Sequence, residues 1–199
     1  MKQAIIVLFL GPLLLHSQEL NWSTQSELED ANEIIITDYG YSSSSLPSSH
    51  DMLKYAPAVE SQQGGTCVGF AAGYCAHSTM LNKALGITSP VHKDMFAMDP
   101  YFIYSVSNSR IAEPCDEGMT FTQFFDGLER IGNMRDLYPP NTSCNFDWLD
   151  YSGELNDELI DYFSAAFPFR ISDYGQIDLE KVDWLNTMKY YLANDVPVV

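Results

Sequence analysis

The sequence predicts an α+β fold that is mainly helical and in which a strand begins only at the end of the chain. Several segments carry apolar residues at helical spacing and are bounded by capping residues. The closing residues 195–199, "DVPVV", are typical of the start of a strand. The 199 residues are 46% hydrophobic and 13% aromatic, which is enough to build one hydrophobic core.

The chain is strongly acidic, with 27 acidic and 10 basic residues and a formal net charge of −17. A surface of this charge repels a phosphate backbone, so nucleic acid is not an expected partner. The sequence contains no CxxC, HExxH or EF-hand spacing, and no GxSxG or phosphate-loop pattern. It therefore predicts no metal site and no cofactor.

Residues 1–17 have the pattern of a secretory signal peptide. Lys2 precedes an apolar run of about 12 residues, which is shorter than the ~20 that a membrane-spanning helix needs. A polar stretch follows, and cleavage is expected after Ser17 or Gln18. Export would place the chain at the cell exterior or in the periplasm, with no stable membrane span and with conditions that allow disulfides. A buried N-terminal helix or strand is the alternative.

Residues 18–51 are interpreted as a polar, Ser-rich linker or a short pro-like segment. They include one possible strand at residues 33–40, "EIIITDYG", and the low-complexity stretch "YSSSSLPSSH" at residues 41–50. Such a Ser-rich stretch cannot bury enough apolar surface to order itself. The compact domain is therefore expected over residues 52–199.

A long first helix is expected to begin at Thr66 or Cys67 and to end just before Gly86, which stands where a glycine commonly follows a helix. Its interior contains Gly69 and Gly73, and each should cost roughly 0.5–1 kcal/mol relative to alanine. Something must offset this cost. A ridge of small residues lets another element approach the backbone, so this helix is predicted to be central.

Two further helices have clear start signals. One is expected at "DPYFIYSV", where Asp99 can act as the N-cap and Pro100 suits the first turn. The other opens with a capping box formed by Thr120 and Gln123, and it is expected to end at Gly132.

A fourth helix is predicted over residues 178–193. Its apolar residues fall on one stripe at helical spacing: Leu179, Val182, Leu185, Met188 and Leu192.

Cys67 is the main candidate for a reactive side chain. Unpaired N–H groups and the macrodipole at a helix N-terminus favour the thiolate, which is the form that attacks carbonyl groups. The alternative is a small buried hydrophobic residue, as most cysteines in globular proteins are. The local features of Cys67 leave both interpretations open.

The stretch "QQGGTCVGFAAGYCA" resembles the active-site segment of papain-like cysteine peptidases. Shared features are a Gln, a Gly-containing turn, a small residue, a Cys that opens a long helix, and an aromatic residue, Phe70, three residues later. Val68 replaces the usual Trp, as in the bacterial-type branch of the family. Downstream, "MDPYFIYSV" and "CDEGMTFTQFFDGLERIGNMRDLYPP" occupy the places of two more family motifs in the same order.

The resemblance implies a helical lobe that carries Cys67, the start of a β-rich lobe, and an active site in the cleft between the lobes. It implies that Cys67 is the nucleophile for protein or peptide substrates and that its N–H and the Gln62 amide form the oxyanion hole. Gly118 would lie in the wall that binds the substrate backbone. The family's Gln stands six residues before its Cys, whereas Gln62 and Gln63 stand five and four before Cys67, so the spacing is irregular.

The catalytic His of the family lies ~130–150 residues after its Cys, which here means at or beyond about residue 197. The chain is therefore expected to be truncated before the catalytic His and Asn, and to be inactive as a fragment. Of its four histidines, only His92 is geometrically open as a base.

The other cysteines point to structural roles. Cys75 lies eight residues after Cys67 on one helix, and the resulting ~12 Å exceeds the ~7 Å limit for a disulfide, so Cys75 is expected in the core. Cys115 and Cys144 are both expected in loops, and whether they are bridged stays open.

Three functions follow from these observations. The leading hypothesis is a secreted cysteine-type peptidase. The second is a catalytically inert papain-like module that binds a protein or glycan at the cell exterior. The third is an exported interaction domain with no peptidase ancestry.

Overall fold

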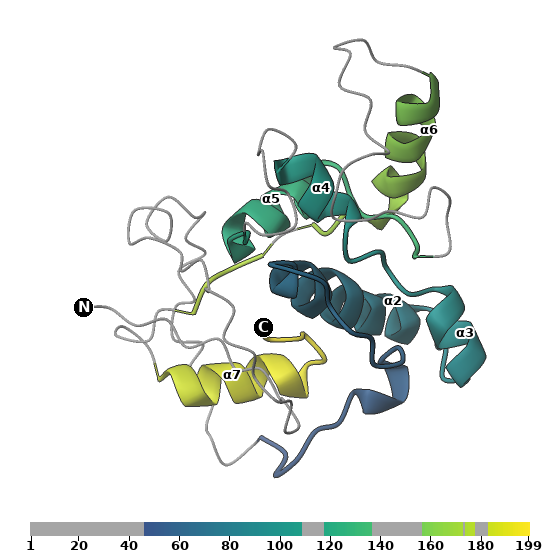
Figure 1. Ribbon diagram of the computed structural model, residues 1–199. Helices are drawn as coiled ribbons and strands as arrows, with labels where there is room; N and C mark the ends of the chain where they lie inside the picture. Colours follow the sequence, from purple (N-terminus) through teal and green to yellow (C-terminus); the bar gives the residue numbers. More distant parts are fainter. Residues whose placement is uncertain (1–45, 109–117, 137–156, 173, 178–182) are drawn as a thin grey trace.

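The computed structural model describes residues 46–108, 118–136, 157–172, 174–177 and 183–199. Figure 1 shows that the elements in these ranges are helical, and they run in the order η2 (Leu53–Tyr55), η3 (Gly69–His77), α2 (Ser78–Ala84), α3 (Pro90–Met95), α4 (Phe102–Asn108), α5 (Phe121–Arg130), α6 (Asp157–Ala166), η4 (Phe167–Phe169) and α7 (Trp184–Ala193). Among these elements, no helix combines the length and the apolar character that crossing a bilayer requires.

The expected α+β class is wrong for the described part of the chain. The described ranges contain no sheet, and their single isolated β-bridge is the antiparallel pair Met98–Arg135. Residues 195–199, expected to begin a strand and with it a β-rich lobe, join no strand. A segment with strand composition forms a strand only where a neighbour accepts its backbone hydrogen bonds, and no described segment does so here.

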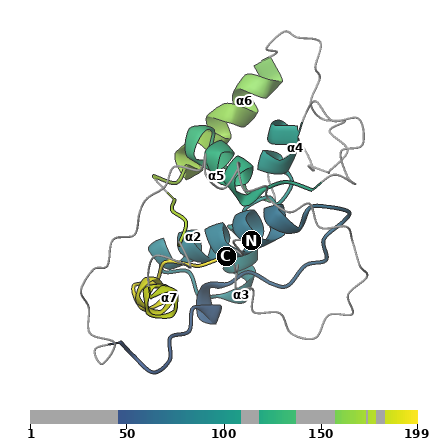
Figure 2. The ribbon, with the colours of Figure 1, turned by 90° about the vertical axis from the view of Figure 1, so that its left-hand side faces the viewer.

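The predicted first helix is confirmed in extent. Helical residues run without a break from Cys67 to Ala84, and Gly86 follows with the positive φ of 68° that a helix end favours. The nine residues of η3 wind as a π-helix, which the sequence pattern did not predict. In Figures 1 and 2 this long helix lies between α7 on one side and α4, α5 and α6 on the other.

The ridge of small residues on η3 meets its neighbours closely, as predicted. A Cβ atom on Gly69 would stand 2.1 Å from the carbonyl oxygen of Pro100. A Cβ atom on Gly73 would stand 2.7 Å from the ring of Phe124 on α5. The chain entering α4 and the side chains of α5 can therefore reach the backbone of η3 only because these positions carry no side chain.

Asp99 joins the start of α4 to the segment that follows α5. Its Oδ1 accepts hydrogen bonds from the backbone N–H groups of Tyr101 and Phe102 at 2.6 and 2.9 Å, so it caps α4 as predicted, although α4 begins at Phe102. Its N–H donates to the carbonyl oxygen of Met134 at 2.7 Å. The buried Asn133 donates from Nδ2 to the carbonyl oxygen of Asp99 at 3.0 Å.

The capping box of α5 is confirmed. The Thr120 hydroxyl accepts from the N–H of Gln123 at 3.2 Å, and the Gln123 side chain accepts from the N–H of Thr120 at 3.0 Å. The helix ends at Arg130, and Gly132 follows with a φ of 89°. Both expected ends of α5 are therefore correct to within a residue or two.

The last helix is only partly predicted. Residues 178–182 lie outside the described ranges, and α7 begins at Trp184 behind the N-cap Asp183. Of the predicted stripe, Met188 is buried, whereas Leu185 is 46% exposed. The short α3 and the acidic α6 were not predicted. With only six residues, α3 is too short to show a helical period in the sequence.

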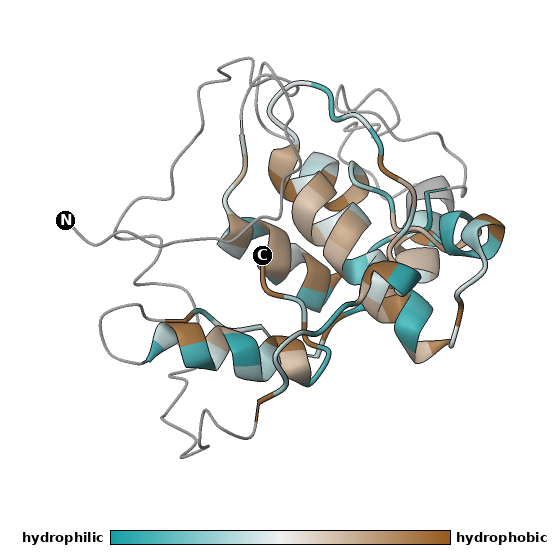
Figure 3. Ribbon diagram, turned by 90° about the horizontal axis from the view of Figure 1, so that it is seen from below, coloured by the Kyte–Doolittle hydropathy of each residue, from teal (hydrophilic) through white to brown (hydrophobic). Residues whose placement is uncertain are grey.

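One hydrophobic cluster joins η3, α4, α5 and α6. Figure 3 shows mostly apolar residues on the helices at the centre and a mixture of polar and apolar residues on those outside. The buried members are Val68, Ala72, Phe102, Ile103, Tyr104, Met119, Phe124, Leu128, Met134, Tyr162 and Ala166.

Candidate functional site

Cys67 is the first helical residue after a tight turn. Gly64 in this turn has a φ of 56°, a conformation that favours glycine. The buried Thr66 donates from its hydroxyl to the carbonyl oxygen of Gln63 at 2.6 Å, which fixes the turn against the helix. The turn-then-helix arrangement predicted around Cys67 is therefore present.

The Cys67 thiol is free and half-buried, and it packs against the edge of the hydrophobic cluster. Burial raises the pKa of Cys67, and hydrogen bonds from the backbone N–H groups of Val68 and Cys67 lower this pKa by less. The net direction is opposite to the one expected from a helix N-terminus alone. The reason is that the free-energy cost of removing the thiolate from water is larger than the stabilisation that it gains from hydrogen bonds with two N–H groups.

The other two predicted site residues are Gln62, which precedes Cys67 in the sequence, and Gly118, which follows it. Gln62 is exposed, and its Nε2 donates to the carbonyl oxygen of Gly64 at 3.3 Å, so the amide lies across the turn before Cys67. Gly118 is half-buried and directly precedes Met119, a member of the cluster on which Cys67 packs.

None of the histidines that the structure describes is hydrogen-bonded to the Cys67 thiol. His50 donates from Nε2 to the carboxylate of Asp195 at 2.7 Å, His77 is buried on η3, and His92 is exposed on α3. Within the described residues, no hydrogen bond joins a histidine to Cys67. His92, the one base considered open within the chain, is therefore not engaged with the thiol.

A group of acidic and phenolic side chains near the same helix was not predicted. Burial is the main cause that raises the pKa values of Tyr74, Tyr101 and Asp136, and the charge of Glu60 raises all three further. Phe70, three residues after Cys67, meets the ring of Tyr101 edge-on at 5.5 Å between centroids. Asp136 comes from a distant part of the sequence, so no local pattern could have predicted this group.

The described residues contain no group of three His, Cys, Asp or Glu side chains that could hold a metal ion. Cys75 is exposed, which corrects the expectation that it lies in the core. Cys115 and Cys144 lie outside the described residues, as do the signal-like residues 1–17.

Comparisons with protein-family models, with curated proteins and with solved structures found no match for this chain. The resemblance to papain-like peptidases therefore rests on the motifs in the sequence.

His77 should make the stability of the protein depend on pH. It is buried, and its Nδ1 has no hydrogen-bond partner in the part of the chain that the structure describes. Burial lowers the pKa of His77 from 6.5 to about 4. The unfolded chain takes up a proton near pH 6.5 and the folded chain does not, so stability should fall as the pH drops from 6.5 to 4, by up to ~3 kcal/mol.

Urea unfolding between pH 7 and pH 4 measures this effect. His77→Met, which cannot bind a proton, should show a flatter decline in the free energy of unfolding than the unaltered protein. His92→Gln is the control, because His92 is exposed and its replacement should leave the decline unchanged. Equal declines in all three proteins would show that His77 does not carry the effect.

Proposed function

We propose that this protein is an exported cysteine-type peptidase that hydrolyses peptide bonds in protein or peptide substrates, with Cys67 as its nucleophile. One observation carries the proposal: a free, half-buried thiol opens a long helix directly after a turn in which Gly64 has a positive φ, and the backbone N–H groups of Cys67 and Val68 lower its pKa against the effect of burial. The signal-like residues 1–17 support export.

In the proposed reaction, a base removes the proton from Cys67 and the thiolate attacks the carbonyl carbon of the scissile bond. The N–H of Cys67 and the Gln62 amide donate hydrogen bonds to the developing oxyanion. The protonated base gives its proton to the leaving amine, and a thioester remains on Cys67. Water then attacks the thioester, which releases the acid and restores the thiol.

The base is assigned to an imidazole other than those of His50, His77 and His92. A positive imidazolium beside Cys67 would lower the pKa of the thiol and oppose the effect of burial. The proposal therefore expects Cys67 to be a weak nucleophile without such an imidazole beside it and a strong one with it.

Labelling with an epoxysuccinyl thiol reagent at pH 7, followed by intact-mass measurement, tests this proposal. With an imidazole beside it, Cys67 should be labelled at least 100-fold faster than the exposed Cys75, and Cys67→Ser should remove only the fast adduct. Without that imidazole, Cys67 should react no faster than Cys75. If the imidazole is present and Cys67 still has no advantage over Cys75, the peptidase is contradicted.

Gln62 and Gln63 form a matched pair for the oxyanion hole. Gln62→Ala should lower kcat for a peptide substrate by ~10²- to 10³-fold, because the loss of one such donor typically has that effect. Gln63→Ala should leave kcat nearly unchanged, since Gln63 contributes its backbone carbonyl to the turn and that group is kept. If Gln63→Ala has the larger effect, the assignment passes to Gln63.

A catalytically inert extracellular binding module is the second candidate. The raised pKa of Cys67 and the bond between the Gln62 amide and its own turn favour it. It predicts that Cys67→Ser alters no reaction rate and that Cys67 keeps the reactivity of an ordinary half-buried thiol.

A further inference from the structure

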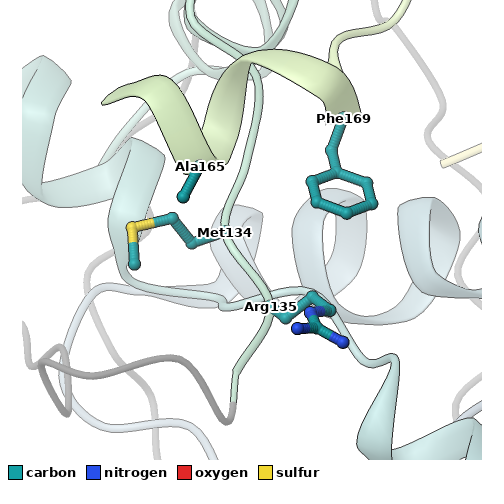
Figure 4. A pocket seen from close by; sticks show the side chains of 4 residues that line it. All are labelled: Met134, Arg135, Ala165 and Phe169. Carbon is teal, nitrogen blue, oxygen red and sulfur yellow. The ribbon is translucent and has the colours of Figure 1, made fainter. Parts of the chain in front are cut away.

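A hollow of about 110 Å³ lies at the end of α6, away from Cys67 in the sequence. The described residues that line it are Met134, Arg135, Ala165 and Phe169. Figure 4 shows the ring of Phe169 pointing towards Arg135, with Met134 and Ala165 beside them. Among these described lining residues, Arg135 is cationic and the other three are apolar.

The walls of this hollow are held in place by backbone contacts. Gly132 approaches α6 so closely that a Cβ atom there would stand 2.1 Å from the carbonyl oxygen of Ala166. On the other wall, Arg135 forms the antiparallel bridge with Met98. The N–H of Asp136 also donates to the carbonyl oxygen of Ala97 at 2.8 Å. The hollow therefore belongs to the folded framework and does not depend on side-chain positions alone.

The guanidinium group of Arg135 has N–H groups that can donate to an anion. Its guanidinium group lies over the ring of Phe96, 5.4 Å from the centroid. No ion pair joins Arg135 to a carboxylate among the described residues, although the chain has 27 acidic residues. Stacking uses the face of the guanidinium and leaves its N–H groups, which lie in the plane of the group, able to donate.

We propose that this hollow binds a small carboxylate that carries a short apolar chain. The planar N–H fork of Arg135 matches the two oxygens of a carboxylate, and Met134, Ala165 and Phe169 offer apolar surface to the chain behind it. A cavity of this size holds a ligand of about five or six non-hydrogen atoms. The carboxylate can belong to a free organic acid or to the C-terminus of a polypeptide.

The net charge of −17 opposes any anion, so a charge-only site would not hold one at moderate salt. The Debye length, beyond which exposed charges are largely screened from one another, is ~8 Å at physiological ionic strength. Binding at 0.15 M salt must therefore come from Arg135 and the apolar wall together, and neither alone should suffice.

Methionine-methyl NMR on the full 199-residue chain tests this proposal at 0.15 M salt, with Met134 assigned through Met134→Leu. Butyrate should shift the Met134 methyl signal to saturation, and butylamine and butanol at equal concentration should not. N-acetyl-glycyl-leucine distinguishes the two sources: binding tighter than that of butyrate, lost in the peptide amide, would favour a polypeptide C-terminus, and binding of butyrate without binding of the peptide would favour a free organic acid. Equal shifts with butyrate and butylamine, or no saturation, would overturn the proposal.

Two variants and a control sharpen the result. Arg135→Gln should weaken butyrate binding at least tenfold. Ala165→Leu, which fills the hollow and keeps the charge, should also weaken it at least tenfold. Arg170→Gln is the control, because Arg170 likewise lies over an aromatic ring, that of Phe167, but does not line the hollow, so the affinity should stay within twofold. Butyrate affinity that is unchanged in Ala165→Leu would show that no ligand enters the hollow.

Discussion

Replacing Gly69 with alanine should destabilise the protein by at least about 3 kcal/mol, even though alanine is the better helix former by about 1 kcal/mol. The new Cβ would stand 2.1 Å from the carbonyl oxygen of Pro100, and that oxygen belongs to the backbone. Hydrogen bonds from Asn133 and to Met134 hold the adjoining Asp99, so the segment cannot withdraw. The long helix would have to move away from the chain entering α4, which would disturb the position of Cys67.

Gly73→Ala is the matched control on the same helix. Its Cβ would meet the ring of Phe124 at 2.7 Å, and a side chain can shift where a backbone carbonyl cannot. The expected loss is about 1–2 kcal/mol. Urea unfolding followed by circular dichroism gives both values. A Gly69→Ala protein as stable as Gly73→Ala would mean that the segment around Pro100 yields readily.

Gly132→Ala should also cost at least about 3 kcal/mol, for two reasons that add. Gly132 has a φ of 89°, where a side chain costs about 1–2 kcal/mol, and its Cβ would stand 2.1 Å from the carbonyl oxygen of Ala166. The alanine would therefore push α6 away from the segment that follows α5.

Gly86→Ala separates these two reasons. Gly86 has a φ of 68°, but a Cβ there would meet nothing within 4 Å. Only the cost of the left-handed backbone remains, about 1–2 kcal/mol. Thermal unfolding should rank Gly132→Ala well below Gly86→Ala. Equal melting temperatures would show that α6 does not press on Gly132 in solution.

Local signals predicted the helices where those signals were strong. The capping box of Thr120 and Gln123 involves residues three apart, and Gly86 follows its own helix, so the relevant atoms lie close together in any chain of this sequence. The small α3 has too few residues to show a period. The "DVPVV" segment has the composition of a strand, but its state depends on a partner strand that no local pattern supplies.

By itself, the sequence determined that Cys67 opens a long helix after a glycine turn and that other elements approach this helix at Gly69 and Gly73, because turns, caps and side-chain size act over a few residues. Only the tertiary structure decided that the pKa of the Cys67 thiol is raised, that the charge of Glu60 raises the pKa of Asp136, and that Arg135 borders a hollow. Burial and charge depend on atoms from distant parts of the chain, and their positions are set only when the whole core is packed.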